Sequence, residues 1–68
     1  SFMNISINKE MRSLPEETTL TDLLERLDIK TKHIAVEINM EIIPKSEFDE
    51  YRLKENDNVE IIRAVGGG

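Results

Sequence analysis

The 68-residue sequence contains no cysteine and no tryptophan, and it has two prolines and three glycines. Without cysteine the chain has neither a disulfide framework nor a thiolate zinc site, so its stability must come from packing and backbone hydrogen bonds. No apolar run approaches the roughly eighteen residues of a membrane span, and no secretory signal opens the chain. We therefore expect a soluble protein that resides in a reducing cytoplasm.

The sequence also lacks a surplus of positive charge. Nine Lys and Arg residues stand against fourteen Asp and Glu residues, which gives a formal net charge of −5. Nucleic-acid binding depends on clustered Lys and Arg, and the sequence shows no such run. We expect no nucleic acid among its partners, but proteins with a basic or apolar docking face.

Side chains that carry catalysis or bind metals are equally scarce. His33 is the single histidine, and no cysteine or second histidine is available to complete a ligand set with it. We therefore assign no metal site and no catalytic residue. The carboxylates at 16–17 and 47–50 are interpreted as a helix start and a solvated face.

The hydrophobic pattern predicts one small domain. Apolar and polar residues alternate, as in half-buried strands, at residues 3–8, 11–14, 34–39, 41–44 and 59–64. Thr19 and Asp22 form a capping-box pattern, and a leucine stripe after them predicts a helix that ends near Asp28. A further helical turn over residues 46–51 is expected to place Phe48 and Tyr51 under the body.

Two predicted hairpins flank the helix, and this order favours a mixed sheet whose outer strands are the hairpin partners. The fold class is therefore α+β, a β-grasp in which four to five strands pack on one helix. We interpret residues 1–2 as a cloning remnant, residues 3–63 as the β-grasp domain and residues 64–68 as a flexible C-terminal tail.

The tail is the feature most suggestive of function, since all three glycines stand at positions 66–68. Glycine has no Cβ, so such a run can pass through a channel too narrow for other residues and deliver a terminal carboxylate into a partner's active site. Residues 64–68, if extended, span roughly 16 Å. The alternative is a frayed or vector-derived end.

Four segments, together with the glycine ending, resemble the ubiquitin-like sulfur carriers, and most closely those of thiamine biosynthesis. These segments are residues 19–24, 35–39, 42–45 and 57–61. Two departures stand out. Gly66 adds a third glycine to the family's Gly-Gly ending, and the hairpin over residues 3–14 shares only its pattern with the family.

The resemblance implies a carrier protein and not an enzyme. An ATP-dependent, E1-like activating enzyme would adenylate the Gly68 carboxylate, and sulfur from a persulfide donor would convert it to a thiocarboxylate for thiazole synthase. The carrier itself would bind no cofactor, since the ATP is used by its partner. Gly66 and Gly67 would thread the tail into these partners, and the docking contacts would come from Ile62, Arg63, Ala64 and Val65.

Other interpretations stay open at this point. Ile62 is alternatively an ordinary strand residue, and Arg63 a solvated charge. The same fold and terminal chemistry occur in the small subunit of molybdopterin synthase. A ubiquitin-like protein modifier or a plain interaction domain is a further alternative.

Overall fold

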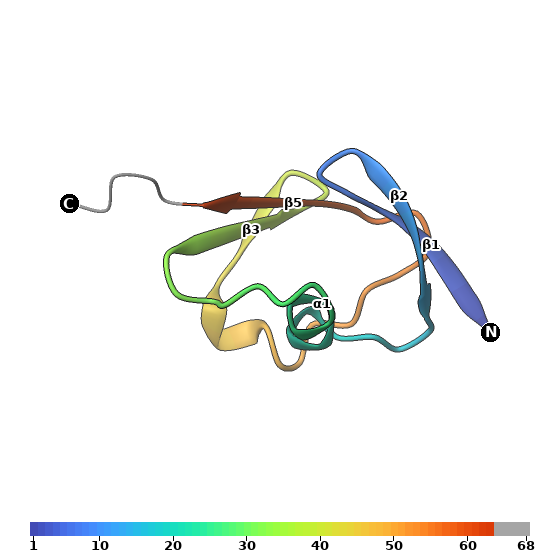
Figure 1. The fold of residues 1–68 in the computed structure, drawn as a ribbon, viewed down its shortest axis with the longest axis horizontal. Coiled ribbons are helices and arrows are strands. Elements are labelled where there is room, and N and C mark those ends of the chain that lie inside the picture. The colour runs from blue at the N-terminus through green and yellow to red at the C-terminus, as the bar shows by residue number, and fades with distance from the viewer. Residues whose placement is uncertain (64–68) are drawn as a thin grey trace.

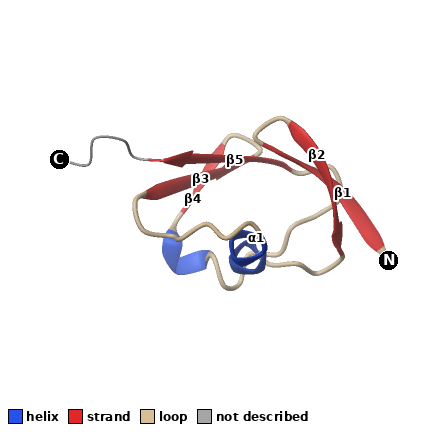
Figure 2. Cartoon of the chain, in the orientation of Figure 1, coloured by secondary structure: helices blue, strands red, loops and turns tan. Residues whose placement is uncertain are grey.

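The computed structural model describes residues 1–63, which form one mixed β-sheet with a single α-helix against one face (Figures 1 and 2). The elements in chain order are β1 (Phe2–Ile7), β2 (Glu10–Pro15), α1 (Leu20–Arg26), β3 (Ile34–Ile38), β4 (Glu41–Ile43), the 3-10 helix η1 (Lys45–Glu47) and β5 (Asn58–Arg63). The predicted order of strands and helix is confirmed.

The sheet has the order β2-β1-β5-β3-β4. β1 and β5 run parallel, whereas the pairs β1–β2, β3–β4 and β3–β5 are antiparallel. The hairpin partners β2 and β4 therefore lie at the edges, as predicted. β1 begins at Phe2, opposite Pro15 in β2, which is one residue earlier than the sequence pattern indicated.

Strict alternation in the strands places one apolar face against α1 (Figure 1). Because successive strand side chains point to opposite faces, every second residue of β1, β3 and β5 reaches the core. The buried apolar residues form one cluster: Met3, Ile5, Ile7, Leu14, Leu20, Leu23, Leu24, Ile34, Val36, Ile38, Ile43, Phe48, Leu53, Val59 and Ile61.

Both hairpins turn without glycine. The β1–β2 turn has φ angles of 49° at Asn8 and 71° at Lys9, and the β3–β4 turn has 53° at Asn39 and 71° at Met40. Two consecutive positive φ angles define the type I′ turn, whose twist matches that of the flanking strands. Asn tolerates this region well at the first position, whereas Lys and Met at the second position bring Cβ close to the following carbonyl oxygen, which is unfavourable.

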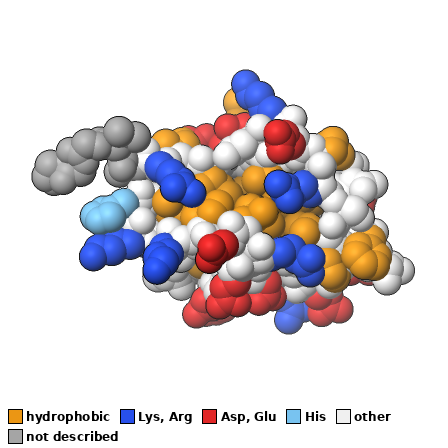
Figure 3. All heavy atoms as spheres, viewed as in Figure 1, with side chains coloured by type: hydrophobic (Ala, Val, Ile, Leu, Met, Phe, Trp, Pro, Cys, Tyr) orange, Lys and Arg blue, Asp and Glu red, His pale blue; other side chains and the backbone are white. Residues whose placement is uncertain are grey.

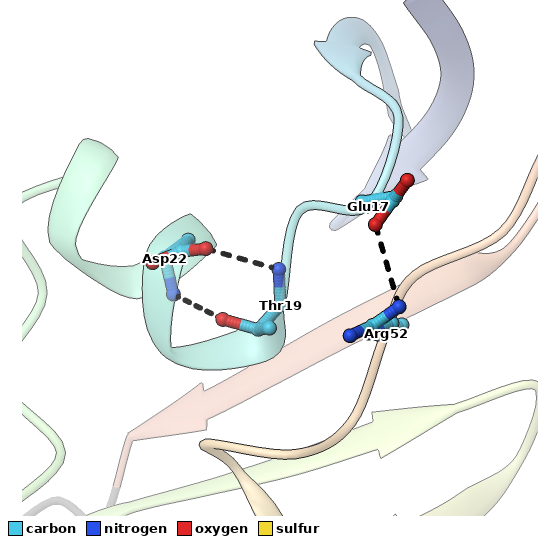
Figure 4. Close-up of polar contacts among 4 residues, drawn as sticks. All are labelled: Glu17, Thr19, Asp22 and Arg52. Atoms are coloured by element: carbon cyan, nitrogen blue, oxygen red, sulfur yellow. Dashed lines mark hydrogen bonds and ion pairs between the residues drawn. The ribbon is translucent and has the colours of Figure 1, made fainter.

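The predicted capping box is present at the start of α1 (Figure 4). The Asp22 backbone N–H donates to Thr19 Oγ1 at 3.1 Å, and the Thr19 N–H donates to Asp22 Oδ2 at 3.3 Å. Nearby, Arg52 forms an ion pair with Glu17 at 3.3 Å. The helix thus begins at the predicted place and lays its leucine stripe on the sheet.

The helix ends at Arg26, two residues before the predicted boundary. Asp28 adopts φ 57°, its N–H donates to the Glu25 carbonyl, and the Ile29 N–H donates to the Leu24 carbonyl. These two bonds are those of a Schellman motif, which usually has glycine where Asp28 stands. The sequence prediction placed the end of the helix near this residue, although no glycine marks it.

The segment after β4 closes one side of the core. The predicted helical turn is present as η1, slightly earlier than expected, and Phe48 beyond it is buried. Tyr51 is half-buried against the same cluster. Backbone hydrogen bonds from the Leu20 N–H to the Tyr51 carbonyl and from the Thr21 N–H to the Phe48 carbonyl fasten this segment to α1.

In the described part of the chain, no helix is long and apolar enough to cross a membrane.

Candidate functional site: the strand that leads to the glycines

β5 is the strand from which the glycine-ended segment continues, and it occupies the centre of the sheet. Of the predicted site residues, Ile62 and Arg63 are the last two of this strand. Ala64, Val65, Gly66, Gly67 and Gly68 lie outside the described residues.

Asn8 holds β5 on the β1 side. The ladder with β1 includes bonds from Ser6 N–H to the Asp57 carbonyl and from Asn8 N–H to the Val59 carbonyl. Where β1 turns away into its hairpin, Asn8 Oδ1 accepts the Ile61 N–H at 2.8 Å. The side chain thus takes the place of the next backbone acceptor and lengthens the support of β5 by one bond.

Asn39 and Asp57 hold the beginning of β5 on the other side. Asn39 Oδ1 accepts the Asn58 N–H at 3.0 Å, and Asn39 Nδ2 donates to Asp57 Oδ1 at 3.0 Å. The other oxygen of the buried Asp57 accepts the Lys54 N–H at 2.8 Å. Both oxygens of this carboxylate are therefore used, and the turn before β5 has a fixed shape.

Side chains on the sheet face opposite α1 form a small apolar patch near the end of β5. Ile62 is 49% exposed and lies opposite Ala35 in β3, and Ile42 in β4 is 70% exposed. Ile42 pairs with Glu37 on the same face. The predicted orientation of Ile62, away from the helix, is confirmed. We call Ile62, Ala35 and Ile42 the outer patch.

On the helix side, basic side chains gather around the end of β5 although the sequence shows no basic run. Lys30, Lys32 and His33 from the α1–β3 connection and Arg63 from β5 line one surface hollow of about 380 Å³. Figure 3 shows Lys and Arg side chains and the histidine at the end of the molecule where β5 finishes. We call these four residues the basic rim.

The sequence analysis missed the basic rim because Arg63 lies thirty residues or more from the other three members in the chain. The β3–β5 register brings them together, since Arg63 pairs directly with Ile34, the residue after His33. Of the four rim residues, the sequence analysis named only Arg63 as a docking contact. Among residues 1–63 no group of three or more His, Cys, Asp or Glu side chains is arranged to hold a metal ion.

These features define the class of protein. A mixed sheet with one helix on one face, and with the last described strand at its centre, is the ubiquitin-like β-grasp fold (Figure 1). A crystal structure of the thiamine biosynthesis protein ThiS from Geobacter metallireducens has the same fold, with a TM-score of 0.85 and 30% sequence identity. The superposition covers 97% of this chain and all of that one.

The chain belongs to the ThiS family, whose model matches residues 5–68. It is 37% identical over 60 residues to the sulfur carrier protein ThiS of Bacillus subtilis strain 168, covering 88% of this chain and 91% of that protein. It is also 36% identical over 66 residues to a thiazole synthase of Paramagnetospirillum magneticum. That match covers 97% of this chain but spans only 20% of the synthase.

Proposed function

We propose that this protein is a sulfur carrier of thiamine biosynthesis, acting as a substrate of its partner enzymes and not as an enzyme itself. The observation that carries the proposal is the ThiS family match, which runs over nearly the whole chain and through the terminal glycines. The similarity to the sulfur carrier protein ThiS of B. subtilis, over 91% of that protein's length, supports the same function.

The chemistry starts at the Gly68 carboxylate. A carboxylate is a poor electrophile, because its negative charge is delocalised and oxide is a very poor leaving group. Adenylation by an ATP-dependent activating enzyme would make a mixed anhydride and release pyrophosphate. A persulfide sulfur would then displace AMP, and a thiol would cleave the resulting acyl disulfide to leave the thiocarboxylate. Cofactor binding is not required of the carrier, because its partner consumes the ATP.

The fold contributes position. β5 is supported along one flank by Asn8 and at its start by Asn39 and Asp57. A partner that grips the domain therefore also fixes the point from which residues 64–68 extend. Fixing that point makes attack at the terminal carboxyl group effectively intramolecular. Gly66 and Gly67 would thread the channel, with Ala64 and Val65 as docking contacts before them.

Thiazole synthase is the proposed sulfur acceptor. The support is the thiazole synthase of P. magneticum, which carries a segment similar to nearly all of this chain. Two domains that are fused in one protein commonly interact when they occur as separate chains. The outer patch, to which β5 contributes Ile62, is the proposed docking surface for these partners because its members are apolar and face away from α1.

The test is intact mass measurement after incubation with ATP, a purified activating enzyme and a persulfide donor. We expect a mass gain that equals replacement of one oxygen by one sulfur. Deletion of Gly67 and Gly68 should abolish the gain and leave the fold intact, since no core residue is removed. An unchanged mass for the full chain under conditions that load a known carrier would refute the proposal, and an isopeptide-linked product would identify a protein modifier instead.

Docking through the outer patch is tested separately. Ile62→Ser should raise the KM of the activating enzyme for the carrier and leave the carrier folded. Met11→Ser is the matched control, since Met11 is 66% exposed on the edge strand β2 and outside the patch. Equal effects of the two substitutions would remove Ile62 from the docking surface.

A further inference from the structure

The basic rim stands out against the charge of the whole protein. The chain has a net charge of −5, yet Lys30, Lys32, His33 and Arg63 surround a single hollow. Asp28 is the only acid among the described residues that line it. In Figure 3 basic side chains and the histidine lie together at the end where β5 finishes, and acidic side chains are numerous along the side on which α1 lies.

The Lys and Arg side chains of the rim form no ion pair within the described residues. The single ion pair in residues 1–63 joins Arg52 and Glu17, neither of which lines this hollow. All four members of the rim are exposed. Half-buried Ile29 and buried Ile34 also line the hollow, so the charges surround an apolar floor.

The rim is held in place by the backbone. The Schellman bonds at Asp28 and Ile29 fix the beginning of the α1–β3 connection. At its end, His33 adopts φ 66° directly before β3, and Ile34 is paired with Arg63. The basic side chains from two distant parts of the sequence are therefore brought to one end of the molecule.

We infer that the basic rim is a docking surface for a carboxylate-rich surface of a partner protein, next to the entry through which the partner receives residues 64–68. The inference rests on the proposed function, since it concerns the orientation of a carrier on its partner. Because the rest of the protein is acidic, an acidic partner surface attracts the end that carries the basic rim and repels the remaining surface. Such complementarity mainly governs orientation and the rate of association.

A protein surface fits better here than a nucleotide phosphate. Phosphate sites commonly use helix N-termini and converging backbone N–H groups. The hollow instead adjoins the connection that follows the C-terminus of α1, which is the negative end of the helix dipole. Separate exposed lysines around an apolar floor resemble the polar rim and apolar core of a protein interface.

The inference also refines the expectation drawn from composition. Net negative charge suggested partners with a basic or apolar docking face, but the structure presents a local surface of opposite sign beside the functional end. The helix ends at Arg26, so Lys30 and Lys32 lie beyond its last turn, and the helix dipole does not account for them.

The decisive experiment compares two charge-reversed carriers. One carries Lys30→Glu and Lys32→Glu in the rim. The matched control carries Lys45→Glu and Lys54→Glu, which change net charge equally at exposed positions that do not line the hollow. Circular dichroism confirms that both are folded, and adenylation kinetics with a purified activating enzyme are then measured from low to high salt.

We expect the rim variant to raise KM about tenfold at low salt, with kcat unchanged, and to weaken the salt dependence of kcat/KM. The control should change KM by less than about threefold, because its charges lie away from the contact. Equal effects of the two variants, or a change in kcat alone, would overturn the inference.

A second measurement is independent of adenylation, so it keeps the inference testable even if the full chain is not a carrier. A ten-residue polyglutamate peptide is titrated into the labelled protein, with amide shifts followed by NMR. We expect saturable shifts at residues 29–34 and 63 in the full chain and in the control, and none in the rim variant. Shifts produced there by ATP or inorganic phosphate but not by the peptide would contradict a protein partner.

Discussion

Glu37 and Glu60 lie directly opposite each other in the β3–β5 ladder, on the sheet face that α1 does not cover. Both side chains are half-buried, and neither is ion-paired to a residue among 1–63. Like charges directly opposite in antiparallel strands destabilise a sheet. The pair therefore lowers the stability of the isolated domain, at the centre of the sheet.

Replacing one member of the pair should stabilise the protein. We expect Glu60→Gln to raise the free energy of unfolding by about 0.2–1 kcal/mol, because it removes the repulsion and keeps the shape of the side chain. Urea denaturation measures the change, which should shrink at high salt. Glu50→Gln, at an exposed turn position, is the control. An equal gain in the control would attribute the effect to total charge and not to the pair.

Asp57 is expected to contribute to the stability of the turn before β5. Asp57→Ala leaves the Lys54 N–H and the Asn39 amide without their acceptor, so we expect a loss of about 1–3 kcal/mol. Hydrogen exchange at Lys54 should accelerate along with the loss measured by denaturation. Asp49→Ala removes an exposed carboxylate that accepts the Thr21 hydroxyl, and it should change stability by less than about 0.5 kcal/mol. Equal losses would contradict a special role for Asp57.

The helix stop at Asp28 offers a stabilising substitution. Asp28→Gly relieves the left-handed strain of about 1–2 kcal/mol and loses about 0.4–1 kcal/mol through greater freedom of the unfolded chain, so a net gain of about 0.5–1 kcal/mol is expected. Thermal and urea unfolding test it. Asp28→Ala removes the same charge but keeps a Cβ, and it should bring no comparable gain. A gain of the same size in Asp28→Ala would identify charge, and not backbone strain, as the cause.

Tyr51 should make stability depend on pH in the alkaline range. Burial raises the pKa of Tyr51 above its ordinary value of 10.0, and the negative charges of Asp57 and Glu41 raise this pKa further. As the pH rises past 10.0, the unfolded chain loses the tyrosine proton before the folded one does, so the free energy of unfolding falls. The contribution of Tyr51 to the free energy of unfolding is complete below about pH 10 and is lost as the pH rises through the folded-state pKa of Tyr51.

Comparison of Tyr51→Phe with the unmodified protein isolates this effect, because every other titrating group is shared. Urea denaturation between about pH 8 and 11 should show a smaller loss of stability in Tyr51→Phe. Parallel curves for the two proteins would show that Tyr51 titrates alike in the folded and unfolded states.

Local patterns in the sequence predicted most of the fold. Alternation identified the strands, the leucine spacing identified α1, and Thr19 with Asp22 marked its first turn. These signals are readable because each depends on residues close together in the chain. The end of α1 was misplaced by two residues, since Asp28 adopts a conformation that is usually a property of glycine.

Contacts between distant segments could not be predicted in the same way. Asn8 and Ile61 are separated by 53 positions, and nothing in either local sequence indicates that one bonds the other. The pairing of Glu37 with Glu60 and the assembly of the basic rim likewise follow from strand register, which is fixed only when the whole sheet forms. The outward orientation of Ile62 was predicted because it needs only the alternation within one strand.

The position of β5 has a mechanical consequence. It is the single connection between the β1–β2 hairpin and the β3–β4 hairpin in the sheet. Any tension applied to the backbone beyond Arg63 runs along this strand and is resisted in shear by the hydrogen bonds of both flanks together. Tension of this kind should therefore leave the two hairpins attached to the sheet.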